Sequence, residues 1–181
     1  MTYPSFSAGD VLAASDMNAV GLWKTGATKT TNVANLDVQS CFSSSYDNYR
    51  VVISVINASA ISNLRLRVLS GTNTPDTGLV YDRFGFSWSS SATNQASANE
   101  ASLYLGAITN ASNTRLNVSF DIYEPNNALE TKILPYAWWS SGGDVAFMAC
   151  RIETTTAYTG LRLFCDSGNL TGSMRVYGYQ N

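Results

Sequence analysis

Apolar and polar side chains alternate with a period of two along most of the chain, from about residue 28 onward. The clearest run is 115–123, in which every second residue is apolar. The run 64–68 places Arg65 and Arg67 on the face opposite three apolar residues. Because successive side chains of a strand point to opposite faces, this pattern is typical of antiparallel strands that bury one face.

Several other segments show strand patterns and are separated by residues that favour turns. The further predicted strands are 49–56, 79–88, 101–108, 131–139, 144–153, 159–165 and 173–179. Clear turn segments are Ser-Gly-Thr-Asn-Thr-Pro-Asp at 70–76 and Ser-Gly-Gly-Asp at 141–144. About eight to ten short strands spaced in this way predict an all-β protein, an antiparallel β-sandwich of jelly-roll type.

The N-terminal residues differ from the strand region that follows them. Residues 6–12 have an extended pattern with a turn, and 13–20 have the pattern of a short helix capped by Ser15. A helix this short is not stable alone in water, so we expect it to dock on another surface. The sequence therefore predicts a particle-attachment segment at 1–24 and a β-sandwich domain at 25–181. The apolar residues expected to make the attachment are Phe6, Val11, Leu12, Met17 and Leu22.

Charged residues are scarce, which excludes several kinds of partner. They make up 13% of the 181 residues and leave a net charge of −2. Binding to nucleic acid or to an anionic membrane surface requires a basic patch that this composition does not supply. No apolar stretch approaches the roughly 20 residues of a membrane-spanning helix. The start lacks the basic and apolar regions of a secretory signal, so we expect synthesis in the cytoplasm.

The chain lacks the residues that most catalytic and metal sites use. It contains no histidine, which removes the usual general base and the usual metal ligand. Cys41, Cys150 and Cys165 show no CxxC spacing, and Cys150 and Cys165 lie in apolar runs where we expect buried free thiols. No nucleotide-binding glycine motif is present. We therefore expect neither an enzyme nor a bound metal or cofactor.

Three short segments carry a resemblance to a known class of proteins. Residues 6–18 have the pattern F-x-A-G-x-x-L-x-A-x-x-x-N, residues 42–49 have F-S-x-x-Y-x-N-Y, and residues 172–178 read Gly-Ser-Met-Arg-Val-Tyr-Gly. In these segments the chain resembles structural proteins of tailed-bacteriophage virions. The resemblance implies a virion structural protein with a β-sandwich domain, assembled as a homotrimer and without catalytic residues.

Three functions are compatible with the sequence. The first is a short tail-associated fibre or receptor-binding protein, docked on the particle through its N-terminal segment. The second is a capsid decoration protein that cements the shell, and the third is a carbohydrate-binding module. The first two imply a location in the virion and other tail or capsid proteins as partners. A host-surface glycan is the expected ligand of a receptor-binding protein.

Two consecutive tryptophans, Trp138 and Trp139, lie in the predicted strand 131–139. One of them should project away from the core, and Trp138 shares its face with Tyr136. We expect these residues to contact a neighbouring subunit or a host-surface glycan, unless a loop of the same chain covers them. Pro135 removes a backbone donor, which places this strand at a sheet edge or at a bulge.

Large apolar residues occupy both faces of the predicted strand 79–88, which contains Tyr81, Phe84, Phe86 and Trp88. One face of each sheet in a two-layer sandwich is normally polar. Apolar residues on both faces indicate that an outer face is covered, and a closed symmetric oligomer would cover it.

Overall fold

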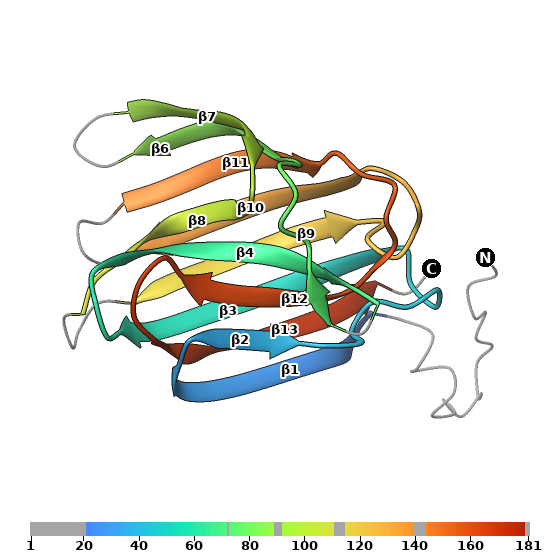
Figure 1. Cartoon of the computed structure of the whole chain (residues 1–181), viewed down its shortest axis with the longest axis horizontal. Helices are drawn as coiled ribbons and strands as arrows, with labels where there is room; N and C mark the ends of the chain where they lie inside the picture. The colour runs from blue at the N-terminus through green and yellow to red at the C-terminus, as the bar shows by residue number, and fades with distance from the viewer. Residues whose placement is uncertain (1–20, 72, 89–91, 111–114, 140–143, 180–181) are drawn as a thin grey trace, which may run out of the picture.

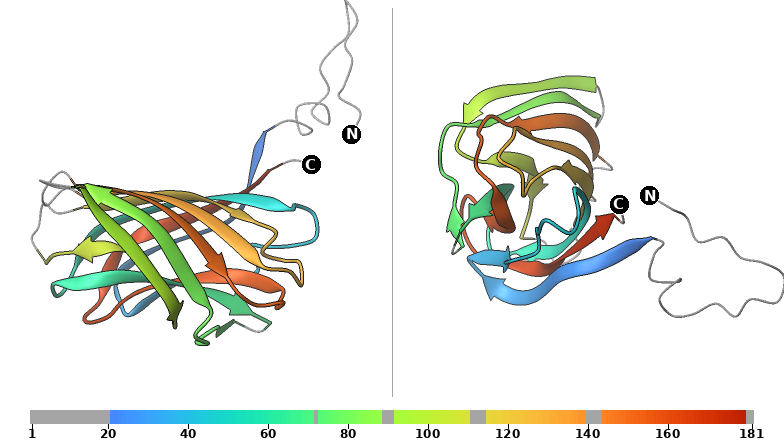
Figure 2. Two further views of the ribbon diagram at one scale, coloured as in Figure 1. Left: turned by 90° about the horizontal axis from the view of Figure 1, so that it is seen from above. Right: turned by 90° about the vertical axis from the view of Figure 1, so that its right-hand side faces the viewer.

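The computed structural model describes residues 21–71, 73–88, 92–110, 115–139 and 144–179 (Figure 1). These residues form thirteen β-strands and contain no helix. The strands build two antiparallel sheets that face each other (Figure 2). The predicted all-β antiparallel sandwich is therefore confirmed, and the jelly-roll connectivity stays a prediction.

The larger sheet contains eight strands in the order β1-β13-β3-β9-β10-β11-β6-β7. Their bounds are β1 (Leu22–Val33), β3 (Asn48–Ala58), β6 (Tyr81–Trp88), β7 (Ala92–Glu100), β9 (Leu116–Tyr123), β10 (Thr131–Trp139), β11 (Asp144–Ile152) and β13 (Leu170–Tyr179). Every neighbouring pair in this sheet is antiparallel.

The smaller sheet contains five strands and covers the inner face of the larger one. It consists of β2 (Asn35–Val38), β4 (Ser62–Ser70), β5 (Thr74–Pro75), β8 (Leu103–Ile108) and β12 (Tyr158–Cys165). β4 lies beside β12, and both β5 and β8 pair with β4. The two sheets are connected at one side, where β1 leads directly into β2 and the Thr28 hydroxyl donates to the Asp37 carbonyl at 2.8 Å.

The core lies between the sheets and is built from the alternating apolar positions. The fully buried side chains of the larger sheet include Tyr49, Val51, Ile53, Leu116, Val118, Phe120 and Ile122. Those of the smaller sheet include Leu64, Leu66, Val68, Leu161 and Leu163. The predicted inward faces of the runs 64–68 and 115–123 are therefore confirmed.

The three cysteines are free thiols in this core, as expected for Cys150 and Cys165. Burial disfavours the charged thiolate. It raises the pKa of Cys41 and Cys150 to about 12 and that of Cys165 to about 11. All three thiols are consequently uncharged and unreactive at neutral pH.

The expectation that Pro135 lies at a sheet edge or at a bulge is wrong. β10 lies between β9 and β11 in the middle of the larger sheet, and both of its ladders keep their register. Pro135 pairs with Phe120 of β9, whereas the ladder to β11 runs over 131–133 and 136–139 and omits positions 134 and 135. The missing N–H is thus accommodated by a local gap in one ladder of a central strand.

The predicted boundary between the two parts of the chain falls inside a strand. β1 begins at Leu22, which pairs with Tyr179 of β13. Leu22 therefore belongs to the larger sheet, although the sequence assigned it to the segment 1–24. The other expected attachment residues, Phe6, Val11, Leu12 and Met17, and the expected helix 13–20 lie outside the described residues.

Candidate functional site: the aromatic face of the larger sheet

The outer face of the larger sheet, turned away from the smaller sheet, carries exposed aromatic side chains. On β6 the alternation buries Tyr81 and directs Phe84, Phe86 and Trp88 outward. Phe84 is 69% exposed and Trp88 is 55% exposed. The sequence expectation of large side chains on both faces of this strand is therefore confirmed.

Neighbouring strands extend this surface. The centre of the Phe147 ring on β11 lies 5.7 Å from the centre of the Phe86 ring and 5.5 Å from the centre of the Tyr136 ring on β10. The Tyr136 and Phe147 rings meet edge to face. These contacts follow from the strand register, because Phe147 is directly opposite Phe86 on one side and Tyr136 on the other. We call this surface the aromatic face; its members are Phe84, Phe86, Trp88, Leu134, Tyr136 and Phe147.

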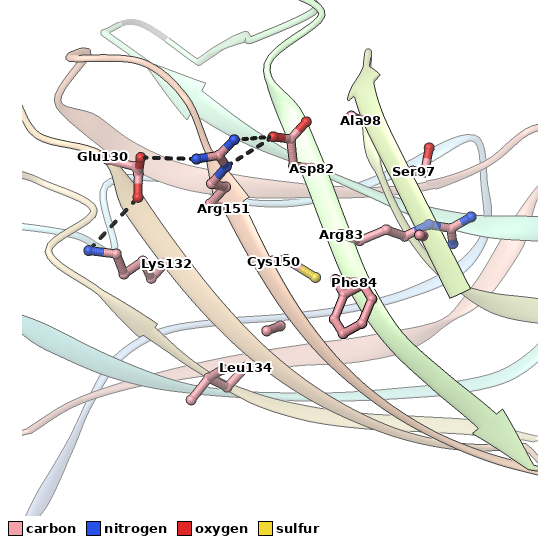
Figure 3. Close-up of a pocket in the computed structure, with 12 residues that line it drawn as sticks. Asp82, Arg83, Phe84, Ser97, Ala98, Glu130, Lys132, Leu134, Cys150 and Arg151 are labelled. Atoms are coloured by element: carbon pink, nitrogen blue, oxygen red, sulfur yellow. Dashed lines mark hydrogen bonds and ion pairs between the residues drawn. The ribbon is translucent and has the colours of Figure 1, made fainter. Parts of the chain in front are cut away.

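A groove of about 670 Å³ lies at one end of the aromatic face (Figure 3). Its apolar part is formed by Phe84, Leu134 and the small side chains of Ala96, Ala98 and Ala149. Its other part is charged and contains Asp82, Glu130, Lys132 and Arg151. An open groove with an apolar part and a few polar groups has the general character of a ligand site.

The charged part of the groove is internally paired. The Arg151 guanidinium lies between the carboxylates of Asp82 and Glu130 (Figure 3), with nitrogen–oxygen distances of 2.9 and 3.9 Å. Arg151 also forms an ion pair with Glu153. Lys132 lies 3.8 Å from Glu130. The backbone N–H of Asn99 and then Arg151 hold the pKa of Asp82 below its usual value. Lys132 and Arg151 thus both have carboxylate partners, whereas Arg83, which also lines the groove, lies with its guanidinium 4.6 Å from the centre of the Tyr104 ring.

A second hollow, of about 320 Å³, lies on the other side of Tyr136 and Phe147. It is lined by outward residues of β3 and β9, which include Val52, Ser54, Asn117 and Ser119. The outer face is therefore aromatic over β10, β11 and β6 and becomes polar toward β9 and β3.

An ion pair fixes the polar half of the outer face. The Arg50 guanidinium donates to both carboxylate oxygens of Asp121, at 2.6 and 2.7 Å, and the Tyr179 hydroxyl donates to Asp121 at 2.5 Å. The hydrogen bonds from Arg50 hold the pKa of Asp121 below its usual value. These residues connect β3, β9 and β13 across the outer surface of the sheet.

Of the predicted contact residues, Tyr136 lies on the aromatic face and is 51% exposed. The backbones of Trp138 and Trp139 continue β10, opposite Asn117 and Leu116 of β9, and their side chains lie outside the described part of the structure. Their predicted role stays a prediction. Leu22 lies on β1, at the opposite end of the sheet order, and is not brought near Tyr136.

Phe147 was not among the predicted contact residues, whereas Phe84, Phe86 and Trp88 were predicted as part of a strand whose outer face an oligomer would cover. The alternation Phe-Gly-Phe-Ser-Trp at 84–88 is the signal for these three, because it places all three aromatic rings on one face of a strand. Phe147 has no such signal, because its place beside Phe86 and Tyr136 depends on strand pairing.

Within the part of the chain that the structure describes, no three His, Cys, Asp or Glu side chains gather in a way that could hold a metal ion. In the same residues, no helix is long and apolar enough to span a membrane.

The comparisons with known proteins leave the family of this chain undefined. No protein-family model and no curated protein sequence matches it. Among solved structures, a single mutant of congerin II is similar over 78% of this chain and 98% of its own, with 12% identity and a TM-score of 0.31. A protein of unknown function from Shewanella oneidensis MR-1 is similar over 98% of this chain and 84% of its own, with 11% identity and a TM-score of 0.25. These values assign neither a family nor an activity.

Proposed function

We propose that this protein is a structural component of a tailed-bacteriophage virion, a short tail-associated fibre or receptor-binding protein that assembles as a homotrimer. The observation that carries the proposal is the aromatic face, which presents six large apolar side chains to solvent in the isolated chain. The resemblance of residues 6–18, 42–49 and 172–178 to virion proteins supports the location. The N-terminal segment is proposed to dock on other proteins of the particle.

Self-association explains the aromatic face better than a structural role within one chain. Phe84 and Trp88 contribute little to the core of their own domain, because more than half of each is exposed. Contiguous exposed apolar patches on soluble proteins usually mark contacts, and aromatic side chains are frequent anchors in interfaces. A closed symmetric oligomer buries the same patch on every subunit without leaving an open end.

Two other functions remain as proposals. A capsid decoration protein would use the same fold and trimer but dock on the shell, and a copy number of hundreds per particle would favour it. The groove beside Phe84 favours carbohydrate binding, because an exposed ring stands next to planar carboxylate and guanidinium groups that could hydrogen-bond hydroxyls. A glycan in this groove would be the host-surface ligand of a receptor-binding protein.

Deletion of residues 1–20 tests the attachment role. Because β1 begins at Leu22, this deletion keeps every strand that the structure describes, and we expect a folded protein with nearly unchanged far-UV circular dichroism. We expect the deleted form to be absent from purified particles when it is the only copy expressed during infection. A folded deletion variant that still enters particles would contradict the attachment role, and an unfolded one would place this segment in the core.

Substitution of Phe147 tests the trimer. Light scattering of the wild type should give a mass that is a multiple of three chains of 19.5 kDa. Phe147→Ser removes the ring at the centre of the aromatic face and should weaken association by at least about 2 kcal/mol per contact, roughly 30-fold.

Ile61→Ser is the matched control for Phe147→Ser, because Ile61 is also an exposed apolar residue, 72% accessible, but lies between β3 and β4, off the aromatic face. It should leave the mass unchanged. A wild-type mass of one chain at micromolar concentration would exclude the proposed trimer. The same mass for Phe147→Ser and Ile61→Ser would also exclude it.

A further inference from the structure

β7 is the last strand of the larger sheet and pairs only with β6 among the described strands. Figure 1 shows it at the outer margin of the sheet, with no other strand beyond it. The backbone N–H and C=O groups along its outer edge therefore have no strand partner in the described residues. Such an edge can accept a strand from another chain, and most proteins protect their edges against this.

The other sheet margins carry the protection that β7 lacks. β1 contains Lys24 and Lys29, has register shifts, and leads directly into β2. β2 has only four residues, and the register of β8 is broken beside Gly106. Charges, short length and bulges are the usual devices that prevent edge pairing.

The β6–β7 hairpin has none of these devices over most of its length. Residues 84–99 contain no charged residue and no proline. The register shift between β6 and β7 is confined to one end, near Tyr81 and Glu100, and pairing is regular from Arg83–Ser97 to Trp88–Ala92. The edge strand is therefore regularly paired and uncharged for about six residues, the length of a typical strand.

We propose that β7 pairs antiparallel with β7 of a second copy of this chain, around a two-fold axis, so that two larger sheets become one continuous sheet. Two copies of β7 can pair in this way without repulsion, because the pairing brings no like charges together. Glu100, the one charged residue of β7, would lie opposite the uncharged Ala92 end of the other copy. The outward side chains of Asn94, Ala96 and Ala98 are small and leave the backbone accessible.

Pairing through β7 goes beyond the proposed trimer and is separable from it. The contact runs along the edge of the sheet and leaves the aromatic face open for a different interface. The wild type should then contain an even number of chains, whether or not the aromatic face forms trimers. Loss of the β7 contact should halve the mass, whereas loss of a trimer contact should reduce it threefold.

Ala96→Lys tests the pairing, with Ala107→Lys as the matched control. Ala96 is an exposed residue in the middle of β7, and Ala107 is an equally small exposed residue on β8. A lysine at 96 would place two like charges at the two-fold contact, so we expect sedimentation velocity to show half the wild-type mass for Ala96→Lys and the wild-type mass for Ala107→Lys. A wild type with an odd number of chains, or equal masses for both variants, would overturn the proposal.

Cysteine cross-linking gives a second readout that does not depend on destabilising the contact. Single cysteines at Asn94, Ala96 and Ala98 place a thiol along the edge, and the native thiols stay silent because they are buried. Mild oxidation should link two chains through at least one of these positions and not through Ala107→Cys. Absence of any linked species at the three positions, in a sample that scatters as an even-numbered oligomer, would also exclude the β7 contact.

Discussion

Replacement of Phe120 by alanine is expected to lower the free energy of unfolding by about 3–5 kcal/mol. Phe120 lies in the middle of β9 and is 1% exposed. It stands between Val51 of β3 and Pro135 of β10 in the larger sheet and points toward the smaller one. Removal of the ring would forfeit its burial and leave a cavity between two packed sheets, which relax only in part.

Urea unfolding followed by tryptophan fluorescence measures this loss. Ser119→Ala is the control, because Ser119 is the adjacent residue on the outer face, and it should change stability by less than about 0.5 kcal/mol. If Phe120→Ala does not fold, Phe120→Leu keeps most of the volume and should cost about 1–2 kcal/mol. A loss below about 1 kcal/mol for Phe120→Ala would show that the ring is not buried between the sheets.

Gly85→Ala is expected to destabilise the protein by about 3–4 kcal/mol, although it adds a single methyl group. A Cβ atom on Gly85 would lie 2.1 Å from the Phe147 carbonyl oxygen and 2.7 Å from Met148 Cα. Both are backbone atoms of β11, the strand paired with β6. The two strands would have to separate, and the contact between Phe86 and Phe147 on the aromatic face would open with them.

Gly71→Asn is the matched control for Gly85→Ala. Gly71 has a φ of 51°, and a Cβ there would meet no atom within 4 Å. Asparagine tolerates this left-handed conformation better than other residues, so thermal unfolding should shift by only a few degrees at most. If Gly85→Ala has the same thermal unfolding midpoint as Gly71→Asn, then β6 and β11 do not approach each other as closely as described.

These experiments separate stability from assembly. Phe120 is buried between the sheets and affects the fold alone, whereas Phe147 and Ala96 lie on exposed surfaces and should affect only contacts between chains. Substitution of Gly85 should affect both stability and assembly, because Gly85 sets the spacing between β6 and β11, the strands that carry the aromatic rings. A variant series over these four positions would show which part of the aromatic face depends on strand geometry.

The sequence by itself determined the fold class and the inward faces of the clearest strands. In β4 and β9 the alternation of apolar and polar residues is regular, and side-chain direction in a strand depends only on position along it. The absence of histidine and the low charge can likewise be read from the sequence, and the expectations drawn from them, no enzymatic activity and no nucleic-acid binding, stay predictions. Part of the candidate site was also readable, because Phe84, Phe86 and Trp88 occupy alternate positions of one predicted strand.

The tertiary structure decided what depends on pairing between distant segments. β7 has no large apolar residue, and only its ladder to β6 makes it a strand. Pro135 was expected at a sheet edge or a bulge, but it lies in a central strand of regular register, because the gap it leaves in one ladder is tolerated there. Phe147 joins Phe86 and Tyr136 only through strand order and register, which arise from packing across the whole chain and not from local side-chain preference.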